Sequence, residues 1–186
     1  MMSAVEIIPA NDRYEDVLSL MKEYVAWLMM NDDKMKEVLA NQHLDDEVAD
    51  FNSKYAPPDG RLYLALLDNE PVGCIALTNL SDQLSDNDPL ATAQADDNDP
   101  NHFVCEGKRL FVRPQARGHQ IGRLLMDRII DDAREIGYRY MRLDSFPFMA
   151  SAVKMYDHYG FYPIGNYCNN PSENAIFREL DLSKHL

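Results

Sequence analysis

The chain has 186 residues, of which 46% are hydrophobic and 26% charged, and both values are ordinary for a globular protein. Three cysteines without a CxxC pair argue against a disulfide framework, and the longest apolar run, residues 24–30, is too short to span a membrane. The sequence opens without a basic and apolar leader. We therefore expect a cytoplasmic protein with a single domain over residues 3–186.

The charge of the chain is strongly acidic but unevenly distributed. There are 31 acids against 18 lysines and arginines, giving a formal net charge of -13, and such a chain repels nucleic acids unless its bases cluster. Six bases do cluster within residues 108–128: Lys108, Arg109, Arg113, Arg117, Arg123 and Arg128. This basic segment is either a solvated helix face balanced by acids elsewhere or a local site for a polyanion.

Apolar spacing and turn residues divide the chain into strands and helices. In chain order, strands are predicted at residues 6–9, 61–67, 71–80, 102–112, 138–145, 161–164 and 174–182. Amphipathic helices are predicted from an N-cap at Asn11 or Asp12 to about residue 30, within 38–51, at 120–137 with Gly137 as the C-cap, and at 148–159. The predicted fold class is α+β, with a hairpin-rich sheet followed by strand–helix repeats.

Residues 81–101 interrupt this order with a segment of different composition. The segment contains six aspartates and two prolines, without a lysine or arginine, and few of its side chains are suited to packing. It predicts a mobile acidic loop inserted between two strands, and we favour its interpretation as a solubilising spacer.

The junction between the predicted strand 102–112 and helix 120–137 contains a turn suited to an anion. Gly118 and Gly122 allow the backbone to approach a ligand, and the first turn of a helix has N–H groups without helical partners. The positive end of the helix dipole adds to this attraction. The glycine spacing matches neither GxGxxG nor a Walker A loop, so the turn and the basic segment together predict a pyrophosphate site.

Residues 110–122 resemble the acetyl-CoA segment of the GNAT superfamily of N-acetyltransferases, in which an apolar strand end precedes Arg/Gln-x-x-Gly-x-Gly/Ala. Arg117, Ile121 and Gly122 match this pattern, and Gln120 stands where the family prefers glycine. Downstream, Met149 stands where the family's next helix usually has Asn. That helix is otherwise matched at Ala152, Met155, Tyr156, Gly160 and Phe161.

The resemblance implies a mixed, mostly antiparallel central sheet with helices on both faces, in three layers. It also implies transfer of the acetyl group of acetyl-CoA to a primary amine by direct attack in a ternary complex, without a metal. Backbone N–H groups of residues 117–123 would hold the pyrophosphate, and the strand end 110–112 would pair with the pantetheine arm. An N–H near Phe111 or Val112 would polarise the thioester carbonyl. The implied cofactor-binding residues are Leu110, Phe111, Val112, Arg117, Gly118, His119, Gln120, Ile121, Gly122, Arg123 and Ala152.

Two residues are candidates for the chemistry. The attacking amine must be neutral, so a base is expected, and the resemblance indicates Glu106, whose alternative role is an ion pair with Lys108 or Arg139. The leaving thiolate needs a proton, and Tyr156 stands at the family's tyrosine position. The alternatives for Tyr156 are a core aromatic role or replacement by Tyr159, and Ser145 is a weaker candidate for orienting either group.

Other functions are less favoured. The spacing of His102, Cys105, His119 and His158 fits no metal-ligand pattern, and Cys105 is expected to pack as a small apolar residue rather than act as a nucleophile. A non-catalytic acyl-CoA sensor on the same fold is the alternative function. We expect a small-molecule or peptide amine as substrate, with neither nucleic acid nor membrane as partner. The identity of the amine and the oligomeric state stay open.

Overall fold

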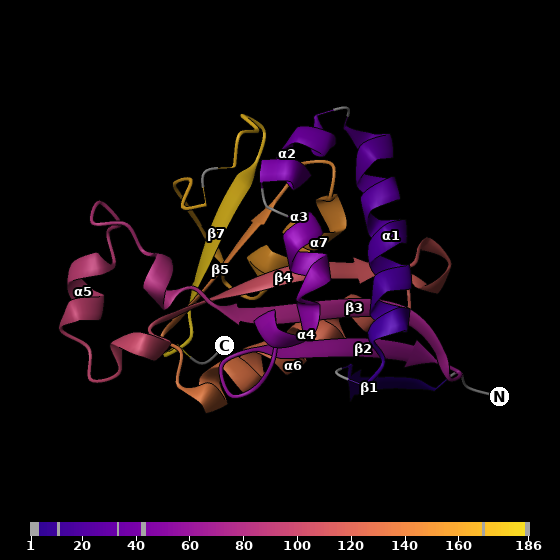
Figure 1. Cartoon of the computed structure of the whole chain (residues 1–186), viewed down its shortest axis with the longest axis horizontal. Coiled ribbons are helices and arrows are strands. Elements are labelled where there is room, and N and C mark those ends of the chain that lie inside the picture. The colour runs from indigo at the N-terminus through magenta and orange to yellow at the C-terminus, as the bar shows by residue number, and fades with distance from the viewer. Residues whose placement is uncertain (1–3, 11, 33, 42–43, 169, 185–186) are drawn as a thin grey trace.

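The computed structural model describes residues 4–10, 12–32, 34–41, 44–168 and 170–184 (Figure 1). Its centre is a seven-stranded sheet in the order β1-β2-β3-β4-β5-β7-β6. Neighbouring strands in it run antiparallel, except for the parallel pair β4–β5. The strands are β1 (Val5–Pro9), β2 (Arg61–Leu67), β3 (Glu70–Asn79), β4 (Val104–Val112), β5 (Tyr140–Ser145), β6 (Tyr162–Ile164) and β7 (Ile176–Asp181). All seven predicted strands are confirmed, with bounds that differ by a few residues.

Helices cover both faces of the sheet, as the α+β prediction requires. They are α1 (Tyr14–Asn31), α2 (Met35–Asn41), α3 (Leu44–Ala49), α4 (Phe51–Lys54), α5 (Ala91–Ala95), α6 (Ile121–Ile136) and α7 (Ala150–His158). On one face, buried residues of α1 and α4 pack against β2 and β3. On the other, α6 and α7 pack against β2–β5 and β7. The sheet therefore lies between two helical layers.

The two predicted helix caps have different outcomes. Gly137 ends α6 in the left-handed region at φ 109°, and its N–H donates to the Ala133 carbonyl, which confirms the predicted C-cap. At the start of α1, Asp12 is not the cap, because the helix begins at Tyr14 with Arg13 at the cap position. Asn11 lies outside the described residues. Two acids in the first turn of α1, Glu15 and Asp16, interact favourably with the positive end of the helix dipole. Among the described residues, the side chain at the cap position makes no capping hydrogen bond.

The sheet opens between β4 and β5. These strands pair only from Val104 to Glu106 of β4 and from Tyr140 to Arg142 of β5. Beyond this point β4 continues along β3, while β5 continues along β7, and Figure 1 shows the two strands separating. The backbone of β4 after Glu106 thus has a sheet partner on one side only, among the residues that the structure describes.

A bulge bends β4 at the start of this open segment. The register with β3 shifts between Cys74 and Ala76, and Arg109 adopts a positive φ of 60°. A left-handed conformation costs a non-glycine residue about 1–2 kcal/mol. Two hydrogen bonds from the Arg109 guanidinium to Glu47 of α3 (2.7 and 3.0 Å) offset this cost and hold the bulge against the helical layer.

The acidic insertion, residues 81–101, differs from its prediction as an unpacked loop. It contains the short helical segments η1 (Ser81–Gln83), α5 and η2 (Pro100–His102) and lies at one end of the sheet (Figure 1). Leu84 and Leu90 pack against the cluster of Leu80, Phe103 and Val104. Two well-placed leucines thus anchor a segment whose overall composition is typical of disorder. None of the helices in the described ranges has both the length and the apolar character of a membrane span.

Candidate active site

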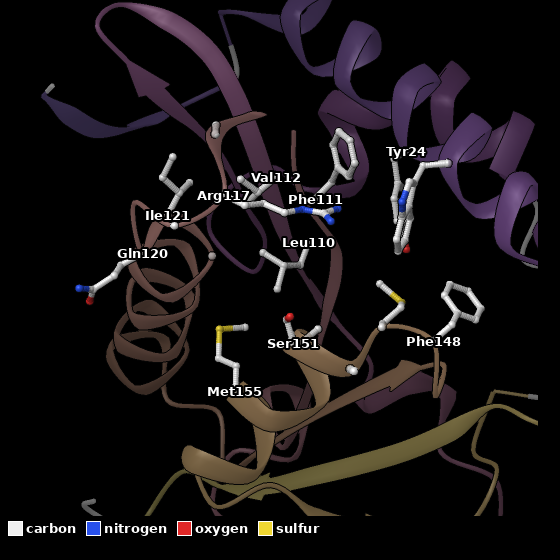
Figure 2. A pocket seen from close by; sticks show the side chains of 17 residues that line it. Tyr24, Leu110, Phe111, Val112, Arg117, Gln120, Ile121, Phe148, Ser151 and Met155 are labelled. Carbon is white, nitrogen blue, oxygen red and sulfur yellow. The ribbon is translucent and has the colours of Figure 1, made fainter. Parts of the chain in front are cut away.

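A cavity of about 380 Å³ lies where the sheet opens, between the end of β4, the start of α6, the start of α7 and the side of α1. Figure 2 shows Leu110 of β4 and Ser151 and Met155 of α7 pointing into it. We name it the cofactor cavity. Its lining includes nine predicted cofactor residues: Leu110, Phe111, Val112, Arg117, Gly118, Gln120, Ile121, Gly122 and Ala152. The other two, His119 and Arg123, are not among the lining residues.

The turn into α6 has the backbone geometry of an anion-binding loop. Gly118 has a φ of 91° and Gln120 a φ of 58°, both in the left-handed region. The second value explains why glycine is preferred at this position, since a side chain there is strained. Among the described residues, the Gln120 side chain makes no capping hydrogen bond to the helix, so the first-turn N–H groups stay available to a ligand. Figure 2 shows this side chain pointing away from the cavity.

The structure divides the basic segment into paired and available cations. Five of its six members lie within 3.9 Å of a carboxylate: Lys108 of Glu106, Arg109 of Glu47, Arg113 of Glu23, Arg123 of Asp127, and Arg128 of Asp132. Arg123 is more than half exposed and 3.9 Å from Asp127. Arg117 instead places its guanidinium 5.5 Å from the centre of the Trp27 ring, at the cofactor cavity. Positive charge thus remains accessible mainly beside the start of α6.

A second, smaller cavity of about 40 Å³ adjoins the first. Both are lined by Tyr24, Leu110 and Met149, so the two cavities adjoin at these residues, and we name the second the acceptor cavity for the role that we propose for it below. Lys108 and Arg109 of β4 and Asp144 of β5 are the charged residues among those that line it. The remaining lining residues are mostly apolar and come mainly from α1, α2, β4 and the β5–α7 connection: Leu28, Met35, Val38, Leu39, Gly107, Phe146 and others.

Tyr156 lines the acceptor cavity and is 5% exposed. Its burial, with smaller effects from Tyr24 and Asp144, raises the pKa of the Tyr156 phenol above its usual value of 10.0. The phenol is therefore protonated at neutral pH and able to donate. Tyr24 is buried as well, and burial raises the pKa of its phenol to about 12, against a lowering effect of Arg109 and with smaller raising effects from Asp144, Cys74 and Glu47.

Glu106 lies behind the wall of the acceptor cavity rather than in it. Lys108 Nζ donates to one carboxylate oxygen at 3.1 Å, and the Tyr167 hydroxyl donates to the other at 2.9 Å. Glu106 is 5% exposed and lines neither cavity. Of the two ion pairs considered for it, the structure contains the one with Lys108.

The other residues considered for the chemistry have different surroundings. The Tyr159 hydroxyl donates to Asp127 of α6, which joins α7 to α6. Ser145 lines the acceptor cavity, where its hydroxyl lies 3.5 Å from the Met149 sulfur. Cys105 is fully buried in the core beneath α6, and burial raises the pKa of its thiol well above the usual value, which opposes a nucleophilic role. No group of three or more potential metal-ligand side chains occurs within the described ranges.

Sequence reasoning missed the aromatic wall of the cofactor cavity. Trp27 and Tyr24 come from α1, and Phe148 comes from the β5–α7 connection, with Trp27 and Phe148 rings 5.8 Å apart. The helical spacing of Tyr24, Trp27 and Leu28 places them near one another on α1, but it does not indicate what that surface faces. Ser151 and Met155 also line the cavity. The sequence motif that contains them gives their order along the chain but does not show that their side chains face a cavity.

Comparison with known proteins identifies the family. The profile of the acetyltransferase (GNAT) family matches residues 24–161, so the chain belongs to this family. A Dictyostelium discoideum protein named as an uncharacterized N-acetyltransferase is 30% identical to it, over 96% of this chain and 99% of its own length.

Solved structures agree on the fold. A GNAT-family acetyltransferase from Staphylococcus aureus Mu50 has a TM-score of 0.67 at 20% identity, covering 96% of this chain and 99% of its own. The PaiA N-acetyltransferase of Thermoplasma acidophilum, in complex with coenzyme A, has a TM-score of 0.62 at 16% identity, covering 96% and 99%. The predicted superfamily and fold class are both confirmed.

Proposed function

We propose that this chain transfers the acetyl group of acetyl-CoA to a primary amine, by direct attack of the amine in a ternary complex. The observation that carries the proposal is the juxtaposition of two cavities at the opening of the sheet. The first has the backbone and charge suited to a pyrophosphate, and the second places a buried phenol beside the residues that both share.

The cofactor cavity offers each part of coenzyme A a matching surface. First-turn N–H groups of α6, with Arg117 at the cavity and Arg123 nearby, would bind the pyrophosphate. The backbone of β4 from Leu110 to Val112 faces the opening without β5 as a partner, so it would receive the pantetheine amides as an added strand. This arrangement would direct the thioester toward Tyr24 and Met149, at the entrance to the acceptor cavity.

The chemistry requires a neutral amine and a protonated leaving group. The amine nitrogen attacks the thioester carbonyl carbon, a C–N bond forms, and the C–S bond breaks. Tyr156, which lines the acceptor cavity, donates its proton to the thiolate as the C–S bond breaks, and free coenzyme A thiol results. The cationic tetrahedral nitrogen loses its proton to water in the acceptor cavity, and the phenolate of Tyr156 is reprotonated from solvent.

We assign Glu106 a positioning role in this proposal. Both of its oxygens already accept hydrogen bonds, from Lys108 and Tyr167, and neither cavity is lined by it. Because Glu106 lines neither cavity, direct removal of a proton from the amine would require a rearrangement of the cavity wall. We therefore expect Glu106→Gln to lower the rate far less than loss of the Tyr156 hydroxyl.

Release of free thiol from acetyl-CoA, measured with a panel of primary amines, tests the function. Tyr156→Phe is expected to lower kcat about 10²-fold or more, without a change in the KM for acetyl-CoA. Tyr159→Phe is the matched control, since its hydroxyl contacts α6 and lines neither cavity. Binding of coenzyme A without thiol release from any amine would instead support the sensor. Equal rates for Tyr156→Phe and wild type would remove Tyr156 from the mechanism.

A further inference from the structure

The acidic insertion places one aspartate in the interior of the protein. The side chain of Asp88 is 9% exposed, whereas Asp86, two residues earlier, is exposed. Leu84 and Leu90 pack on the core on either side of Asp88, and the Leu90 N–H donates to its carboxylate at 2.9 Å. The fold of the insertion thus directs a single carboxylate onto the sheet.

The partner of Asp88 is Arg142, in the middle of β5. Two hydrogen bonds of 2.6 and 2.9 Å join the guanidinium to the two oxygens of Asp88. A third, of 2.7 Å, joins it to Glu179 of β7. Arg142 is 3% exposed. A buried cation in bidentate contact is held in one orientation, and the insertion supplies half of the carboxylates that hold it.

Arg142 links the insertion to the wall of the acceptor cavity. Its guanidinium lies 5.4 Å from the centre of the Tyr167 ring. The Tyr167 hydroxyl donates a hydrogen bond to Glu106, and Glu106 accepts another from the ammonium of Lys108, which lines the acceptor cavity. Contacts therefore run without a break from Asp88 to the group that faces an acceptor.

We propose that the acidic insertion is a positioning element of the acceptor side, and that Asp88 is the residue through which it acts. Asp88 fixes Arg142 under the Tyr167 ring, and Tyr167 fixes Glu106 and hence the Lys108 ammonium at the cavity wall. The assignment of this cavity to the acceptor rests on the proposed acetyl transfer, but the effect of Asp88 on Lys108 does not.

The test compares two substitutions that remove the same charge from the same segment, Asp88→Asn and Asp86→Asn. Lys108 is first measured by labelling with an N-hydroxysuccinimidyl acetate and mass spectrometry, which needs no turnover. We expect Asp88→Asn to increase labelling of Lys108 at least 5-fold and Asp86→Asn to match wild type. Equal labelling of Lys108 in the two variants would overturn the proposal.

Turnover adds a second readout that a purely structural role would not move. Asp88→Asn should raise the KM for the amine at least 5-fold and leave coenzyme A binding unchanged, because none of the residues that link Asp88 to Lys108 lines the cofactor cavity. Loss of coenzyme A binding in Asp88→Asn would mean general unfolding and would count against a positioning role.

Tyr167→Phe, which keeps the ring but loses the contact with Glu106, should reproduce the increased labelling of Lys108 that we expect for Asp88→Asn. Wild-type labelling in Tyr167→Phe would also overturn the proposal. Absence of turnover by wild type would defeat the acetyl transfer alone, since the labelling still decides the role of Asp88.

Discussion

The substitution Glu47→Gln removes the carboxylate that holds the β4 bulge against the helical layer. Glu47 is 4% exposed and accepts hydrogen bonds from Arg109, from Lys54 at 2.9 Å and from the Tyr55 hydroxyl at 2.8 Å. Burial alone would raise the pKa of this carboxyl, but the hydrogen bonds and charge of Arg109, with Lys54, lower it from 4.5 to about 2. The folded state thus strongly favours the charged form.

Two estimates of the stability that Glu47→Gln removes agree. A pKa lowered by this amount corresponds to about 3 kcal/mol of stability at neutral pH. Breaking one side of a buried ion pair typically costs about 3–5 kcal/mol, because the remaining charge stays buried. We therefore expect Glu47→Gln to lower the free energy of unfolding by about 3–4 kcal/mol at pH 7.

The pH dependence has a definite sign. Because the folded-state pKa is the lower one, the stabilisation is complete above pH 4.5 and is lost as the pH falls toward 2. Between pH 7 and pH 3.5, the difference between wild type and Glu47→Gln should shrink by about 1 kcal/mol. Urea unfolding at both pH values measures it, with the exposed Glu37→Gln as the control. Equal stability of Glu47→Gln and wild type at pH 7, or a difference that does not change with pH, would refute the reasoning.

Two further predictions concern the cofactor cavity and the insertion. Trp27 is the single tryptophan of the chain, and the Arg117 guanidinium lies over its ring. If bound coenzyme A contacts Arg117, the tryptophan fluorescence emission should change on binding. Unchanged emission in a sample that calorimetry shows to be saturated would contradict this prediction. The ring nitrogens of His102 lie 2.8 Å from an Asp59 oxygen and 2.9 Å from an Asp99 oxygen, and hydrogen bonds donated to these two carboxylates raise the pKa of His102 above 6.5. The stabilisation that protonated His102 provides is therefore complete below pH 6.5 and is lost as the pH rises past the raised pKa. We expect His102→Gln to lower the melting temperature more at pH 6 than at pH 9. An equal destabilisation at both pH values would contradict that origin.

The parts of the site that sequence reasoning predicted are those that are contiguous in the chain. Residues 110–122 contain a strand end, two glycines and a helix start, and local backbone rules are enough to predict that they lie around one site. The element order also followed from apolar periodicity, since each helix and strand has its own repeat.

The parts that it missed depend on contacts between distant segments. Trp27 and Phe148 meet across the cofactor cavity from elements more than 100 residues apart. The sequence left open whether acids elsewhere balance the basic segment, and Glu47 and Glu23 neutralise two of its arginines from the first helices. Composition was misleading for Asp88, because an aspartate in an acidic segment is usually exposed and its partner lies 54 residues away.

Calorimetric titration with coenzyme A is the most direct test of the central claim, that the cavity at the start of α6 binds the cofactor. Gly122 lines this cavity, and a Cβ there would lie 3.9 Å from Val112 and 4.0 Å from the Met155 sulfur, so a larger side chain would extend into the space. We predict saturable binding to wild type and at least 100-fold weaker binding to a folded Gly122→Phe variant. Absence of binding to wild type, or equal affinity of the two proteins, would contradict the account.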